Sequence, residues 1–108
     1  MRNSFERKAL RHYRLRGYRI LGTNVWIGGY ELDLVVRRGR RLAFVEVKAK
    51  SGKRLGDPLE MVTVEKQRRV RRAAEAWLAS HPECAELEAR FDVVAVRGSR
   101  VECLREAF

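Results

Sequence analysis

The stretch YELDLVVRRGRRLAFVEVKA, residues 30–49, decides the fold that this sequence predicts. Apolar and polar residues alternate on both sides of the central RRGR, and Val, Leu and Phe are frequent, which is typical of two neighbouring β-strands. A type II′ turn at Gly39 and Arg40 fixes the register of the hairpin. A shift of one residue would mix charged and apolar residues on each face, so the turn and the hydrophobic pattern favour the same register. That register pairs apolar residues on one face: Leu32 with Val47, Leu34 with Val45, and Val36 with Ala43.

The other face of this hairpin is predicted to carry a charged group. In the same register Asp33 lies opposite Glu46, and Glu31 lies opposite Lys48. Opposite residues have Cβ atoms about 4.5–5.5 Å apart, and like charges at that distance destabilise the pair. A divalent cation such as Mg²⁺, which binds oxygen ligands, would offset the repulsion, and a nearby lysine could then assist water and phosphate. An ordinary surface hairpin with cross-strand ion pairs is the alternative, and the spacing alone leaves both open.

The composition of the chain points to an anionic partner. The 108 residues suffice for one domain, residues 1–108, and carry 24 Lys and Arg against 14 Asp and Glu, a net charge of +10. Arginine-rich surfaces also arise through ion-pair networks, but an excess of ten positive charges favours nucleic acid. No segment has the roughly 20 apolar residues of a membrane-spanning helix, and the N-terminus lacks a signal peptide, so we expect a cytoplasmic protein without a membrane partner.

The remaining elements follow from periodicity and turn residues. Cys84 and Cys103 are interpreted as reduced structural thiols, and an H-x2-C pair at His81 and Cys84 lacks a second pair of zinc ligands. The predicted elements are a helix over 4–16, a strand over 18–26 interrupted near Gly22, a turn at Gly28-Gly29, a basic loop over 48–58, a helix from Thr63 that ends before His81, a helix end or loop over 83–90, a buried strand over 91–96 and a last strand over 101–108.

Basic residues gather on the two helices and the loop between the third strand and the second helix. They are candidates for contact with the phosphate backbone, although charged residues that merely solvate an outer face are the simpler explanation for part of them. These candidates are Arg7, Arg11, Lys50, Lys53, Arg54, Lys66, Arg68, Arg69 and Arg72.

The order of elements, with ELD on the second strand and EVK on the third, resembles the PD-(D/E)xK nuclease superfamily. More closely, the chain is similar to the small bacterial YraN-like family within it. The resemblance implies an α/β (α+β), restriction endonuclease-like three-layer fold, with a mixed β-sheet flanked by helices in the order αβββαβ(β). The matching segments are Phe5-Glu6, GYRIL at 17–21, YELDL at 30–34, FVEVK at 44–48, LGDPLEM at 55–61 and RFDVV at 90–94.

The resemblance also implies a site. Its metal, Mg²⁺ or Mn²⁺, would be bound by Asp33, Glu46, the backbone carbonyl of Val47 and Glu6, the last like an acidic residue on the first helix of archaeal Holliday junction resolvases. Lys48 would be the catalytic lysine beside Asp33 and Glu46, and Glu31 would support the site. Tyr30 and Phe5 depart from the family, which has glycine at both positions.

The activity implied is endonucleolytic hydrolysis of DNA phosphodiester bonds, with branched DNA as a candidate substrate. Resolvase-like enzymes of this fold act as dimers, so a homodimer through the last strand, with Val101 and Leu104, is a further expectation. The alternative is a non-catalytic nucleic-acid-binding accessory protein that retains the nuclease fold. An RNA or ribosomal partner ranks below both, since no aromatic platform for single strands is evident.

Overall fold

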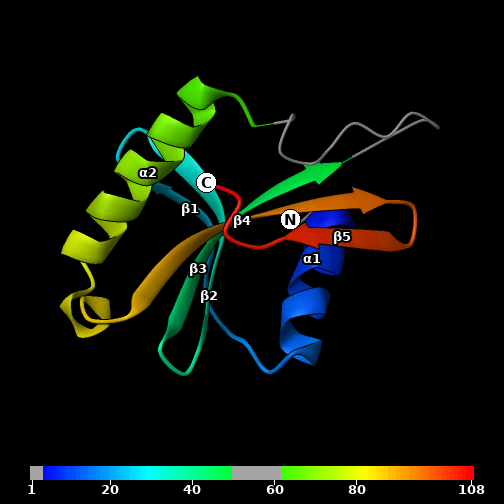
Figure 1. Cartoon of the computed structure of the whole chain (residues 1–108), viewed down its shortest axis with the longest axis horizontal. Helices are drawn as coiled ribbons and strands as arrows, with labels where there is room; N and C mark the ends of the chain where they lie inside the picture. The colour runs from blue at the N-terminus through cyan, green and yellow to red at the C-terminus, as the bar shows by residue number, and fades with distance from the viewer. Residues whose placement is uncertain (1–3, 50–61) are drawn as a thin grey trace.

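A computed structural model describes residues 4–49 and 62–108, and it confirms the predicted fold class. The sheet has five strands in the order β1-β2-β3-β4-β5, with one helix on each face (Figure 1). Only the β3–β4 pair is parallel, because α2 crosses over between these strands, and the other neighbours are antiparallel. The elements are α1 (Ser4–Leu15), β1 (Arg19–Ile27), β2 (Tyr30–Arg38), β3 (Arg41–Ala49), α2 (Val64–Ala79), the 3₁₀ helix η2 (Pro82–Cys84), β4 (Glu88–Arg97) and β5 (Arg100–Leu104).

Each helix buries one apolar stripe on the sheet. On one face Ala9, Leu10 and Tyr13 of α1 pack against a cluster that includes Leu34 and Val45. On the other face α2 contributes Val70, Ala73, Ala74 and Trp77 to a cluster with Val35, Leu42 and Phe44. Since helices of this length gain most of their stability from such packing, the two apolar stripes explain both helices.

The ends of α2 agree with the prediction from sequence. Thr63 is the N-cap and accepts a hydrogen bond from the Lys66 N–H at 3.2 Å. After the helix, the His81 ring stacks on Trp77 with centroids 3.8 Å apart, and its Nδ1 lies 2.7 Å from the carbonyl oxygen of Trp77. These contacts give His81 a structural role at the C-terminus of α2.

The predicted register of the β2–β3 hairpin is confirmed over part of its length. Pairs run from Arg38/Arg41 to Leu34/Val45, and Gly39 has the positive φ of 61° that its turn position requires. The ladder ends at Leu34/Val45. The expected backbone pairs beyond it, Asp33 with Glu46 and Glu31 with Lys48, are therefore wrong.

An irregularity in β1 explains where the alternation in β2 changes. The β1–β2 ladder has a bulge between Ile20 and Gly22, and it skips Asn24 and Asp33, where Asn24 has a positive φ of 49°. Leu34 packs under α1 as predicted, but Leu32 packs under α2. The prediction that Leu32 and Leu34 share a face is therefore wrong, because the period of two is shifted by one residue at this interruption.

The C-terminal strands differ from the prediction in length. β4 begins at Glu88 because parallel pairing with β3 starts at Arg41/Glu88. β5 ends at Leu104, since Glu106 has a positive φ of 50° and donates its N–H to Asp92 Oδ1 at 3.1 Å. The last strand is thus shorter than predicted, and it forms one edge of the sheet.

Candidate active site

The candidate site lies where β2 and β3 separate. Beyond Leu34/Val45, β3 stays paired with β4 as far as Ala49/Val96, while β2 stays paired with β1. Asp33 spans the opening, because its Oδ2 accepts the backbone N–H of Val47 at 2.8 Å. A side-chain carboxylate here replaces a hydrogen bond of the sheet and is held in place by it.

Glu46 is the deepest charged residue of the site, with 5% of its surface exposed. Its Oε1 lies 3.2 Å from Lys48 Nζ and accepts a hydrogen bond from the Tyr30 hydroxyl, also at 3.2 Å. Burial and the charge of Glu46 raise the pKa of Tyr30, so the phenol stays protonated and donates to Glu46. From the sequence, Tyr30 is only a departure from a family pattern, and nothing in the spacing predicts this contact.

The positive charge near Asp33 does not balance its burial and the negative charge around it. Burial, followed by the negative charge of Glu46, raises the pKa of Asp33 to about 7, and Glu6 adds to the increase. The Val47 N–H and Lys48 act in the opposite direction but do not compensate. An ionised Asp33 beside Glu46 is therefore costly, and a bound cation would remove that cost.

A second lysine approaches the site from the first turn of α2. The proximity of Lys48, followed by burial, lowers the pKa of Lys66. Burial acts to lower the pKa of Lys48 as well, but the negative charge and hydrogen bond of Glu46 act in the opposite direction, and the pKa of Lys48 is raised. Lys66, predicted from sequence as a backbone-binding residue, thus lies beside the predicted catalytic lysine.

Glu6 and Glu31 form a separate acidic group on the α1 side. The Asn24 amide donates to Glu6 Oε2 at 2.6 Å and to Glu31 Oε1 at 3.0 Å. Tyr30 and Leu32 flank Glu31 and pack under α2, so Glu31 projects from the opposite face, away from Lys48. The expected pairing of Glu31 with Lys48 is wrong, and Asn24 is a site residue that periodicity gave no reason to select.

The donor set has the composition that Mg²⁺ requires. Across residues 4–49 and 62–108, no three side chains of His, Cys, Asp or Glu lie close enough to enclose a metal ion. Mg²⁺, however, uses one or two carboxylates and completes its shell with water and substrate phosphate. Asp33 and Glu46 supply two such carboxylates, whereas Glu6 accepts a hydrogen bond from Asn24 and acts on Asp33 through its charge. The Val47 carbonyl stays a predicted ligand.

The predicted basic residues lie on both sides of the sheet. Arg7 and Arg11 are exposed on α1, and Arg68, Arg69 and Arg72 are exposed on α2, where Arg69 pairs with Glu65 at 3.1 Å. The predicted basic loop from residue 50 onward, with Lys50, Lys53 and Arg54, lies outside the described residues.

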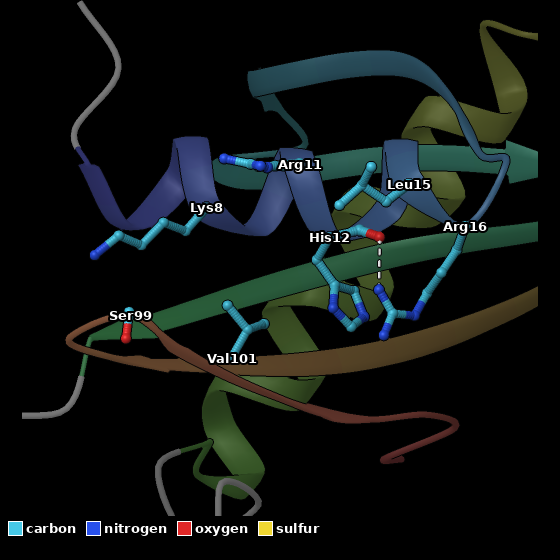
Figure 2. A pocket seen from close by; sticks show the side chains of 7 residues that line it. All are labelled: Lys8, Arg11, His12, Leu15, Arg16, Ser99 and Val101. Atoms are coloured by element: carbon cyan, nitrogen blue, oxygen red, sulfur yellow. Dashed lines mark hydrogen bonds between the residues drawn. The ribbon is translucent and has the colours of Figure 1, made fainter.

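A shallow basic pocket separates α1 from the β4–β5 turn (Figure 2). It has a volume of about 310 Å³. The Lys8 ammonium reaches across to the carbonyl oxygen of Gly98, and Arg16 donates to the His12 carbonyl at 3.0 Å. Its lining combines apolar and cationic side chains: Lys8, Arg11, His12, Leu15, Arg16, Ser99 and Val101.

Comparison with known proteins identifies the family. A model described as uncharacterised protein family UPF0102 matches residues 5–96. Similar relatives include UPF0102 proteins of Frankia alni (46% identical over 108 residues, 95% of this chain and 89% of the relative), Alkalilimnicola ehrlichii (40% over 106 residues, 98% and 84%) and Shewanella amazonensis (38% over 103 residues, 95% and 94%). The chain belongs to UPF0102, the YraN-like family of the restriction-endonuclease-like superfamily. Neither α-helix of the described residues is long and apolar enough to cross a membrane.

Proposed function

We propose that this UPF0102 chain is a Mg²⁺- or Mn²⁺-dependent endonuclease that hydrolyses DNA phosphodiester bonds, with branched or otherwise structured DNA as its substrate. The observation that carries the proposal is the group formed by Asp33, Glu46 and Lys48 where the sheet opens. Two carboxylates are held close together there, burial and the charge of Glu46 raise the pKa of Asp33, and a lysine lies beside them. A protein that only bound phosphate would gain nothing from carboxylates at that place.

The residues of the site divide the work of hydrolysis. A divalent cation held by the two carboxylates and the Val47 carbonyl would lower the pKa of a water ligand and withdraw charge from the phosphate. Asp33 is oriented by the Val47 N–H, and Glu46 is oriented by Tyr30 and Lys48. Lys48 carries the positive charge that stabilises the phosphate as negative charge develops in the transition state.

The basic surfaces would hold the DNA backbone without selecting sequence. The net charge of +10 attracts DNA, and the arginines of α1 and α2 are suited to phosphate oxygens. β5 lies at a sheet edge, where a second copy could pair and give a homodimer with two sites for a symmetric junction. Sedimentation of the protein alone and on a four-way junction would measure the stoichiometry.

The proposal is tested by titrating Mg²⁺ and Mn²⁺ into the protein by calorimetry and by assaying cleavage of linear and four-way-junction DNA. Wild type should bind the metal and cleave DNA. Asp33→Asn should neither bind the metal nor cleave DNA, and Lys48→Ala should bind metal and DNA without cleaving. Glu75→Gln, an acid-to-amide change at an exposed position of α2, serves as the matched control and should behave as wild type. Full cleavage by Asp33→Asn or Lys48→Ala would overturn the assignment.

A non-catalytic accessory protein is the second candidate. It is favoured by the absence, within the described residues, of three acidic or other ligating side chains around one point. Salt-sensitive DNA binding with no metal binding at millimolar concentration would select this function over the nuclease.

A further inference from the structure

Trp26 is the most exposed aromatic residue of the described chain. It is 71% exposed, whereas Trp77, the other tryptophan, is 2% exposed and belongs to the buried face of α2. A single exposed apolar residue is ordinary on a protein surface and needs no special explanation. The position of Trp26 is what distinguishes it, because it borders the candidate active site.

The strand pairing places Trp26 directly opposite Glu31. Val25 and Ile27 pack under α2, so Trp26, which lies between them, projects from the opposite face of the sheet, together with Glu31. Opposite residues have Cβ atoms about 4.5–5.5 Å apart. Asn24 links Glu31 to Glu6, so the indole lies at the margin of this acidic group.

The backbone that carries Trp26 is held on both sides. The β1–β2 ladder continues past it to Ile27/Tyr30, and the turn that follows packs against α2 so closely that a Cβ added to Gly28 would lie 3.1 Å from the Ala73 Cα. Glu31 and Asp33 are about 7 Å apart along β2. The backbone at Trp26 is therefore held close to Asp33 along the sheet, on the α1 face that also carries Glu31 and Glu6 and not on the face of Lys48.

We propose that Trp26 stacks on an unpaired base of the DNA whose backbone passes through the candidate active site. This inference deepens the proposed function and rests on it for the identity of the ligand. Bases inside a duplex are already stacked on both faces, so the indole can reach only a base at a junction, flap or single-stranded end. Stacking is tolerant of sequence because every base has a π-face. The substrate class is therefore DNA with unpaired nucleotides beside the cut phosphate.

DNA fits this surface better than a second copy of the chain does. The net charge of +10 attracts DNA, and a homodimer through β5 would leave Trp26 uncovered because β1 lies at the opposite edge of the sheet. The Glu31 carboxylate beside the indole would repel a phosphate, but it can accept a hydrogen bond from the exocyclic amine of a stacked base. A base stacked on the Trp26 indole would therefore contact the indole and the Glu31 carboxylate, while its phosphate lies away from Glu31.

The test measures binding in EDTA, where no metal-dependent cleavage occurs. Fluorescently labelled single-stranded DNA, a splayed fork and a blunt duplex are titrated with wild type, Trp26→Ala and Trp26→Phe. Trp26→Ala should bind the single strand and the fork about 5- to 150-fold more weakly and the duplex as wild type does. Trp26→Phe should retain most of the affinity, and Leu15→Ala, which alters a side chain that is 73% exposed, is the control for loss of an exposed apolar group.

The outcomes separate this inference from the proposed function. Equal affinity of Trp26→Ala and wild type for all three DNAs would overturn the stacking role even if the protein cleaves DNA. Loss confined to the unpaired DNAs would support stacking even if no cleavage is found with Mg²⁺ or Mn²⁺. Equal loss on all three, together with a changed oligomeric state on gel filtration, would show that Trp26 serves contact between copies and would overturn the inference.

Discussion

Replacing Asp33 with asparagine should stabilise the metal-free fold at neutral pH, although it removes a residue of the proposed site. Burial and the charge of Glu46 raise the pKa of Asp33 from 3.8 to about 7. The ionised carboxylate is thus less favourable in the folded chain than in the unfolded chain. Asparagine has nearly the same shape, carries no charge, and its amide oxygen can still accept the Val47 N–H, which lies 2.8 Å from Asp33 Oδ2.

The size of the effect follows from the two pKa values. The interval between 3.8 and about 7 corresponds to about 4 kcal/mol of free energy of unfolding. Below pH 3.8 the Asp33 carboxyl is protonated in the folded and the unfolded chain, so it does not destabilise the fold. The free energy of unfolding falls as the pH rises above 3.8, and the destabilisation by Asp33 is complete above about pH 7. Because Asp33 keeps some contact with water, we expect about half of this, roughly 2 kcal/mol, as the gain from Asp33→Asn at about pH 8.

Urea unfolding of wild type, Asp33→Asn and the exposed control Glu75→Gln measures this gain between about pH 4.5 and 8, in EDTA. The free energy of unfolding of Asp33→Asn should exceed that of wild type near pH 8, and the difference should shrink toward pH 4.5. Saturating Mg²⁺ should then stabilise wild type alone, by linkage of binding to folding. Equal stability of Asp33→Asn and wild type at every pH, or a gain independent of pH, would refute the charge repulsion inferred at this site.

Three further predictions concern other parts of the molecule. Tyr30→Phe removes a hydrogen bond to Glu46 and should lower the cleavage rate about tenfold while circular dichroism stays unchanged; an unaltered rate would contradict a role in orienting Glu46. The buried Asp92 carboxylate accepts hydrogen bonds from the Tyr13 hydroxyl and from Arg90, whose Nε lies 3.1 Å away. Asp92→Ala removes the acceptor of both and should lower the free energy of unfolding in urea by about 3–5 kcal/mol; a loss below about 1 kcal/mol would contradict a stabilising role for these contacts. Arg11→Gln should reduce the slope of log affinity against log salt for duplex DNA by about 1, and an unchanged slope would exclude a phosphate contact.

Much of the fold was predictable because local physics decides it. The amphipathic stripe and the Thr63 cap determine α2, and the Gly39 turn with its alternating flanks determines the register of β2 and β3 from Leu34/Val45 to the turn. Asp33, Glu46 and Lys48 were selected by extending that register beyond Leu34/Val45. The backbone pairs do not form there, but the structure still brings the three side chains close to one another. Their selection needed only spacing and charge along two neighbouring strands.

The errors about which face each β2 side chain takes have a common origin in the interruption at Asn24. Period-two alternation put Leu32 beside Leu34 and Glu31 opposite Lys48, but the positive φ of Asn24 and the missing bridge to Asp33 shift the alternation. Asn24 is an asparagine in a strand-like segment, and only its side-chain contacts show why it tolerates that conformation. No periodic pattern records such a shift.

The sequence by itself determined the family, the order of elements and the pair of strands that carry Asp33 and Glu46. These depend on neighbours along the chain or on composition. Only the tertiary structure decided that Asp33 bridges to Val47, that Tyr30 donates to Glu46, and that Trp26 stands exposed beside Glu31. Those facts depend on where β2 leaves β3 and on which face each side chain takes, and the backbone sets both through long-range packing that local propensity does not encode.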